Sequence, residues 1–156
     1  MVTEEERDIE RLTSQTAHES IGRKAIHIAW LIANGEHVPN TWVVRPGLTG
    51  EHLAEAVTRS LPSDQTYAVR SSANVEDGED VSYAGQFNTE LDVTAGEVVG
   101  AVERVRLSAL SERVVAYRDH LGADNDIVMS VLVQAMVKPV VSGVCFSRNP
   151  MTGLNE

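Results

Sequence analysis

The feature that most constrains the fold is a long apolar run near the C-terminal end of the chain. The run DIVMSVLVQAMV extends from Asp126 to Val137 and is rich in β-branched residues. A strand this apolar has to be covered on both faces, so it predicts the centre of a sheet. A second apolar run, Val140–Ser147, follows after only Lys138 and Pro139. That spacing is typical of a hairpin or tight turn, so the two runs predict antiparallel pairing.

Shorter strands and helices precede this run. Residues typical of strands predict three more of them, over Thr41–Val44, Thr66–Arg70 and Phe87–Val93. Apolar residues at helical spacing predict helices over residues 20–35, 49–61 and 96–121, with Gly35 as the cap that ends the first. Helices and strands are mixed and the last strands cluster. We therefore predict an α+β fold with a mostly antiparallel sheet and flanking helices.

Length and composition indicate one folded domain. The chain has 156 residues with 42% hydrophobic content, which is enough for a hydrophobic core. Residues 1–19 are polar and charged, and we expect an arm or a frayed helix there, with the domain over residues 20–156. The net charge is −10, so nucleic acid and anionic lipid are not expected as general partners. A local cationic cleft can still bind a phosphate compound.

The compartment is predicted from cysteine usage and hydropathy. Cys145 is the single cysteine, which excludes an internal disulfide and suits a reducing compartment. No apolar run reaches the roughly 18 residues of a membrane span. The first residues, MVTEEERDIE, are acidic where a signal peptide would be basic. These features predict a soluble, cytoplasmic protein.

A polar segment follows the predicted strand that ends at Arg70. Ser71 and Ser72 come next, then an acidic loop, and then Gly85. A guanidinium at the end of a strand can bind a phosphate through two nitrogens, with the two hydroxyls as further donors. The alternative is an ion pair between Arg70 and a nearby carboxylate. Gly85 allows close approach of backbone to a ligand, or forms an ordinary turn.

Two further polar residues are candidates for a ligand site. Lys24 lies near the start of the first predicted helix, where the helix dipole disfavours a cation unless an anion shares the site. The alternative is a solvated surface lysine. Gln134 interrupts the central apolar strand, and a buried amide needs hydrogen-bond partners. It bonds either a ligand base or a neighbouring loop.

Common catalytic and metal-binding motifs are absent from the sequence. The five histidines show no metal-ligand spacing, and there is no P-loop motif. The carboxylates of residues 76–80 fit a solvated loop better than a metal site. We therefore predict no metal ligand and no catalytic residue in this chain.

Four segments, in order, resemble the nucleotide-binding domain of the phosphoenolpyruvate-utilising dikinases. That group includes phosphoenolpyruvate synthase, pyruvate phosphate dikinase and rifampin phosphotransferase. The segments are SIGRKAIHIAWLIANGEHVPNTWVV, AVRSSANVEDGEDVSYAGQFNT, YRDHLG and VLVQAMVKPVVSGVCFSRNPMTG. The second, with an arginine, two serines, an acidic loop and alanine-glycine-glutamine, is the family's most distinctive signature.

The resemblance implies an ATP-grasp fold and assigns residues to ATP. Lys24 and Arg70 would contact the phosphates, and Gln134 and Met136 would flank the adenine. Gly85, Gln86 and Thr89 would lie along the loop that covers the phosphates. The implied function is ATP binding for phosphoryl transfer to a histidine in another domain. The alternatives are a rifampin phosphotransferase-like enzyme, or a non-catalytic module in which Lys24 and Arg70 pair with carboxylates.

The sequence also departs from the family pattern. Arg23 stands between Gly22 and Lys24, where the family has a second glycine, and the stretch from Val44 to Ala68 is short. The family's magnesium ligands and phosphorylated histidine have no match here, so we expect Mg²⁺ to be held outside this chain and no turnover by the chain alone. The expected partners are the remaining dikinase domains or a partner chain, and self-association through apolar surface near Ser147. The sequence leaves open whether the chain is a fragment, part of a split enzyme or a natural short relative.

Overall fold

The structure is a computed structural model that describes residues 9–16, 21–74, 88–109 and 128–143, together with Cys145, Asn149 and residues 151–154. These residues form one five-stranded antiparallel sheet in the order β1-β2-β5-β3-β4. The strands are β1 (Glu10–Arg11), β2 (Thr41–Val44), β3 (Thr66–Ala73), β4 (Thr89–Thr94) and β5 (Met129–Ala135). Strand β5 is central, as the long apolar run predicts.

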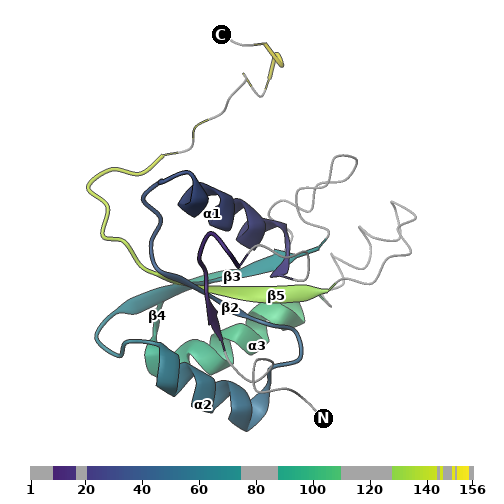
Figure 1. Cartoon of the computed structure of the whole chain (residues 1–156), viewed down its shortest axis with the longest axis vertical. Coiled ribbons are helices and arrows are strands. Elements are labelled where there is room, and N and C mark those ends of the chain that lie inside the picture. The colour runs from purple at the N-terminus through teal and green to yellow at the C-terminus, as the bar shows by residue number, and fades with distance from the viewer. Residues whose placement is uncertain are drawn as a thin grey trace.

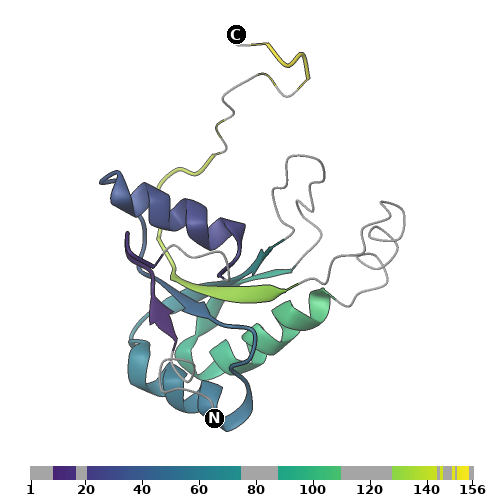
Figure 2. The ribbon, with the colours of Figure 1, turned by 45° about the vertical axis from the view of Figure 1, so that its right-hand side comes forward.

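Helices cover both faces of the sheet. Helix α1 (Arg23–Ala33) lies on one face, and α2 (Gly50–Ser60) and α3 (Val98–Ser108) lie on the other (Figures 1 and 2). A short 3₁₀ turn, η3 (Ala95–Glu97), leads from β4 into α3. The α+β prediction with a mostly antiparallel sheet and flanking helices is confirmed. No helix in the described ranges is long and apolar enough to cross a membrane.

Strand alternation divides the core into two clusters of unequal size. Val131 and Val133 of β5 belong to the larger cluster, against α2 and α3. Leu132, between them, belongs to the smaller cluster, against α1. The buried members of the smaller cluster are Leu12, Ile21, Ala25, Ala29, Val43 and Leu132. Successive side chains of a strand point to opposite faces, so β5 contributes to both.

Two predicted segments differ from the structure. The expected strand over Val140–Ser147 and its hairpin are absent from the described residues 140–143 and Cys145, and Val140 and Val141 are fully or almost fully exposed. An apolar run forms a strand only when a neighbouring strand accepts its hydrogen bonds. The N-terminal segment was expected to be an arm or a helix. Instead β1 pairs with β2, because Ile9 and Leu12 on either side of it are buried.

Tyr67 of β3 provides a first testable prediction. It is fully buried, its hydroxyl donates to Pro62 O and accepts from Gln65 Nε2, and its ring packs edge-on against Trp42. Replacement by phenylalanine leaves the Pro62 carbonyl without this donor. The free energy of unfolding should fall by about 1 kcal/mol near neutral pH.

The same substitution should change the alkaline limb of the stability curve. Burial raises the pKa of the Tyr67 hydroxyl above its usual 10.0. The unfolded chain then loses the proton first, so this residue's contribution is complete below the unfolded pKa and is lost as pH rises through the folded pKa. Urea unfolding should therefore show a smaller difference in the free energy of unfolding between the original chain and Tyr67→Phe at pH 11 than at pH 8. A gap that is the same at both pH values would contradict this account.

Candidate functional site

The predicted site residues that the structure describes gather on the α1 face of the sheet. Arg70 is paired across the sheet with Leu132, which belongs to the α1-side core. Ser72, two residues on, hydrogen-bonds to the segment that leads into α1. Because side chains alternate along a strand, Ala68, Arg70 and Ser72 share this face. Thr89 is the β4 partner of Arg70 and is exposed beside it.

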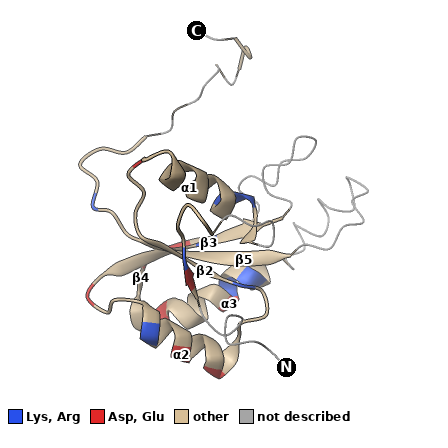
Figure 3. Ribbon diagram, in the orientation of Figure 1, with Lys and Arg blue, Asp and Glu red and all other residues tan. Residues whose placement is uncertain are grey.

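Lys24 reaches β3 from the first turn of α1. Its Nζ lies 3.2 Å from Ser71 O and 3.4 Å from Ser71 Oγ, so the ammonium sits at the residue next to Arg70. The first turn of α1 carries Arg23 and Lys24 and no acidic residue, which Figure 3 shows as a basic end of the helix. Cations at a helix N-terminus oppose the helix dipole. A bound anion would offset both the dipole and the two like charges.

Arg70 is a candidate for binding an anion. Its side chain is half-buried, and within the described parts of the chain it makes no ion pair and no side-chain hydrogen bond. A half-buried guanidinium has five donors and is stabilised by an anionic partner. A hollow of about 360 Å³ lies between the start of α1 and the residue that follows β3, lined by Arg23, Ile26, His27 and Asn74 but not by Arg70 or Lys24. Arg23 is the cationic residue that lines this hollow.

Gln134 and Met136 lie toward the other end of β3. Gln134 is opposite Ala68, and its Nε2 donates to Thr41 Oγ1 at 2.9 Å. The amide thus has a partner on the neighbouring strand, and the side chain remains half-exposed. The Met136 amide donates to Thr66 O at 2.9 Å. Met136 also lines a hollow of about 620 Å³, together with Ser63, Asp64, Gln65, Thr66, Asp92, Thr94, Val137 and Lys138.

These positions form a row along β3, which we call the β3 row. At one end, Lys24 contacts Ser71, and Arg70 is paired with Thr89. Toward the other end, Gln134 is paired with Ala68, and Met136 hydrogen-bonds to Thr66. Its ends, at Ser71 and Thr66, are five positions apart along β3, a span of about 16 Å at roughly 3.3 Å per residue. Cationic groups occupy one end, and an amide and a thioether occupy the other. Such a row can hold a ligand that is anionic at one end and a flat polar ring at the other.

Not every predicted residue is placed in the row. Gly85 and Gln86 lie outside the described residues. The Ser72 hydroxyl was expected to be a phosphate donor, but it is fully buried and donates to Ile21 O at 2.9 Å, so its one proton is already used. That expectation is wrong, because β3 continues past Arg70 and carries Ser72 into the sheet. No group of three or more metal-ligating side chains occurs in the described ranges.

Sequence reasoning missed one residue that shapes the site. Gly22 precedes α1 at φ +81°, and a Cβ added there would lie 2.1 Å from Ser72 O. Only glycine permits this contact between the start of α1 and β3. The signal in the sequence is a glycine at the position before the predicted helix, where a side chain that caps the helix would be usual. The residue it contacts, Ser72, is 50 residues later, so neighbouring residues do not reveal the contact.

Comparison with known proteins adds an independent observation. The family described as "Pyruvate phosphate dikinase, AMP/ATP-binding domain" matches residues 48–156, which is more than half of the chain and includes Arg70, Thr89, Gln134 and Met136. Lys24 lies before the matched range.

Curated relatives carry two kinds of name. A rifampicin phosphotransferase from Streptomyces is 43% identical over 108 residues, covering 66% of this chain and 12% of that protein. The phosphoenolpyruvate synthase of Pyrococcus furiosus is 44% identical over 113 residues, covering 69% and 14%. That of Aeropyrum pernix is 46% identical over 88 residues, covering 55% and 11%. The chain thus spans only about an eighth of the length of these relatives.

The extent of the family match and the level of identity agree with the resemblance found in the sequence. The chain belongs to the pyruvate phosphate dikinase AMP/ATP-binding domain family.

Proposed function

We propose that this chain is the ATP-binding portion of a phosphoenolpyruvate synthase-like dikinase, in which ATP donates a phosphoryl group to a histidine of another domain. The observation that carries the proposal is the β3 row. Lys24 and Arg70 stand at one end of it, and Arg70 has no ion-pair partner among the described residues. Phosphoryl transfer depends mainly on positioning and charge neutralisation, which such cations supply.

Each residue of the row has a role in this proposal. Lys24 and Arg70 bind the phosphates, and Thr89 lies beside Arg70. Gly85 and Gln86 belong to the loop that covers the phosphates. Gln134 hydrogen-bonds the adenine edge, and the Met136 thioether packs on the ring. The order of residues along β3 supports this assignment. The cations lie at one end of the row and the uncharged side chains at the other, as the phosphates and the base lie at opposite ends of ATP.

The rest of the reaction needs groups that this chain does not supply. Mg²⁺, when bound, would neutralise negative charge on the phosphates, and we expect its ligands outside this chain. The expected partners are the remaining dikinase domains or a partner chain. Exposed apolar residues support such contacts or self-association: Val137, Val140, Val141, Met151 and Leu154 lie along the segment that leaves the sheet after β5 (Figure 1).

Two alternatives differ in what they predict. A rifampicin phosphotransferase-like enzyme would use the same ATP site with an antibiotic acceptor, and the relative from Streptomyces carries that name. A non-catalytic module would have both Arg70 and Lys24 paired with carboxylates. For Arg70, the lack of such a partner within the described ranges favours nucleotide binding.

Calorimetric titration of ATP into the 156-residue chain, with and without Mg²⁺, tests the proposal. Arg70→Ala should weaken binding by on the order of 1.5–3 kcal/mol, the cost of a charge-assisted hydrogen bond, which is roughly a 10- to 150-fold rise in Kd. Adenosine, which has no phosphates, should bind both proteins equally. Absence of ATP binding by the original chain at millimolar concentrations would count against the proposal.

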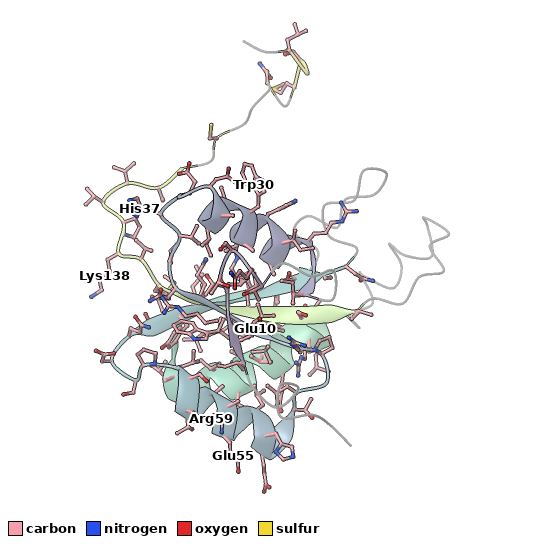
Figure 4. All side chains as sticks on the ribbon, in the orientation of Figure 1. Glu10, Trp30, His37, Glu55, Arg59 and Lys138 are labelled. Carbon is pink, nitrogen blue, oxygen red and sulfur yellow. The ribbon has the colours of Figure 1, made fainter. Side chains whose placement is uncertain are left out.

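Arg59→Ala is the matched control. Arg59 lies on α2, across the sheet from the β3 row, and its side chain is labelled in Figure 4. The substitution Arg59→Ala removes one positive charge, as Arg70→Ala does, but from the opposite face of the sheet. Equal losses of ATP affinity in the two variants would mean that Arg70 acts through net charge alone.

A further inference from the structure

We propose that Ser72 is a positioning residue for ATP, holding the first turn of α1 against β3 so that Lys24 stays at the phosphate end of the β3 row. This inference rests on the proposed function. Ser72 does not touch the ligand in this account. It acts through Lys24.

The Ser72 hydroxyl joins two elements that are far apart in the chain. It donates to Ile21 O at 2.9 Å and accepts from the Ala25 amide at 3.1 Å, and it is fully buried. The first amides of a helix have no partner within the helix. Because the N-cap residue of α1 is Gly22, no side chain at that position can supply one. The side chain of Ser72, on strand β3, therefore caps the N-terminus of α1.

Backbone contact strengthens the same junction. A Cβ on Gly22 would lie 2.1 Å from Ser72 O and 2.6 Å from Ser72 Oγ. The start of α1 thus rests directly on the backbone of β3, at a distance that any side chain would increase. The hydroxyl and the close contact together determine how far the helix stands from the strand.

Lys24 lies in sequence between Ile21 and Ala25, the two residues whose backbone groups hydrogen-bond to Ser72. Its Nζ reaches Ser71, the neighbour of Ser72. A lysine side chain has many rotamers, so its ammonium is well placed only when its backbone is. Loss of the Ser72 hydroxyl should release the first turn of α1 and let the ammonium move away from Arg70.

A double-mutant cycle on ATP affinity tests the inference. Ser72→Ala should raise the Kd for ATP about fivefold, and Lys24→Met should raise it at least as much. In the Lys24→Met background, Ser72→Ala should change the Kd less than twofold, because the group that it positions is already gone. The Kd for adenosine should not change in any variant.

Controls separate positioning from a general loss of stability. Ser130 is the cross-strand partner of Ser72 and is equally buried, so Ser130→Ala removes a hydroxyl from the adjacent position. It should leave ATP affinity within twofold of the original. Hydrogen exchange gives a second readout without ligand: Ala25 should lose protection in Ser72→Ala, and Val69 should not.

The outcomes distinguish this inference from the proposed function. If ATP binds and Lys24→Met weakens it, but Ser72→Ala costs as much with Lys24 as without it, the positioning role is overturned and ATP binding stands. Unchanged protection of Ala25 in Ser72→Ala would also overturn it. If the original chain does not bind ATP, the proposed function fails and this inference fails with it.

Discussion

Replacing Gly22 by alanine should lower the free energy of unfolding by on the order of 4 kcal/mol, which combines backbone strain and overpacking. The residue adopts φ +81° and ψ 159°, a region that is almost restricted to glycine. Its added Cβ would also meet Ser72 O at 2.1 Å, which requires either α1 or β3 to move. Domains of this size are typically stable by about 5–15 kcal/mol, so the loss should be large in urea or thermal unfolding.

Gly35 is the matched control for this prediction. It follows the other end of α1 at φ +79°, but an added Cβ there has no atom within 4 Å. Gly35→Ala should therefore cost only about 1 kcal/mol, from the positive φ alone. The difference between the two variants measures the contact between α1 and β3. Equal stabilities would show that the backbone at residues 21–23 relaxes freely, and the account of the junction would be wrong.

Most of the sheet and its helices could be predicted from apolar periodicity. The strands at Thr41–Val44 and in the run through Leu132 are confirmed, as are the first two helices and the turn at Gly35. These elements have a buried face that repeats with the period of the element. The prediction uses only neighbouring residues, and for these elements neighbouring residues are sufficient.

Segments whose structure depends on distant partners could not be predicted in the same way. Residues 71–73 of β3 read as the start of a polar loop, yet Ser71, Ser72 and Ala73 pair with β5 and are buried. Serine is compatible with a strand when another strand and a helix satisfy its hydroxyl. The strand β1 has only two residues and is held by its pairing with β2.

The residues of the candidate site could be named from the sequence, but their arrangement in space could not. The family resemblance assigns roles to Arg70 and Gln134, and composition alone leaves alternatives for both. Their common face follows from the register, in which Leu132 is opposite Arg70 and Gln134 is opposite Ala68. A shift of one residue in that pairing would move one of them to the α2 and α3 side. Register between strands far apart in sequence is a property of the fold.

Replacing Leu132 by alanine should cost about 2–5 kcal/mol of stability and should also weaken ATP binding. Leu132 is fully buried in the smaller core cluster, and its cross-strand neighbours are Val43 and Arg70. Leu12, Ile21 and Val43 are buried in the same cluster, and such surroundings relax only partly around a truncated side chain, so a cavity should remain. We expect α1 to loosen first, because this cluster is the apolar contact between α1 and the sheet.

Val133→Ala separates this effect from a simple loss of stability. Val133 is the next residue of β5 and is equally buried, but it faces α2 and α3 in the larger cluster. Its truncation should cost about 2 kcal/mol and leave the α1 face intact. Hydrogen exchange in α1 and calorimetric titration with ATP are the measurements. Protection in α1 and ATP affinity should both fall in Leu132→Ala and remain in Val133→Ala, because only the former removes packing beneath the helix that carries Lys24. If both variants lose protection in α1 equally, the two clusters unfold as one unit, and the site has no separate support from the α1 side.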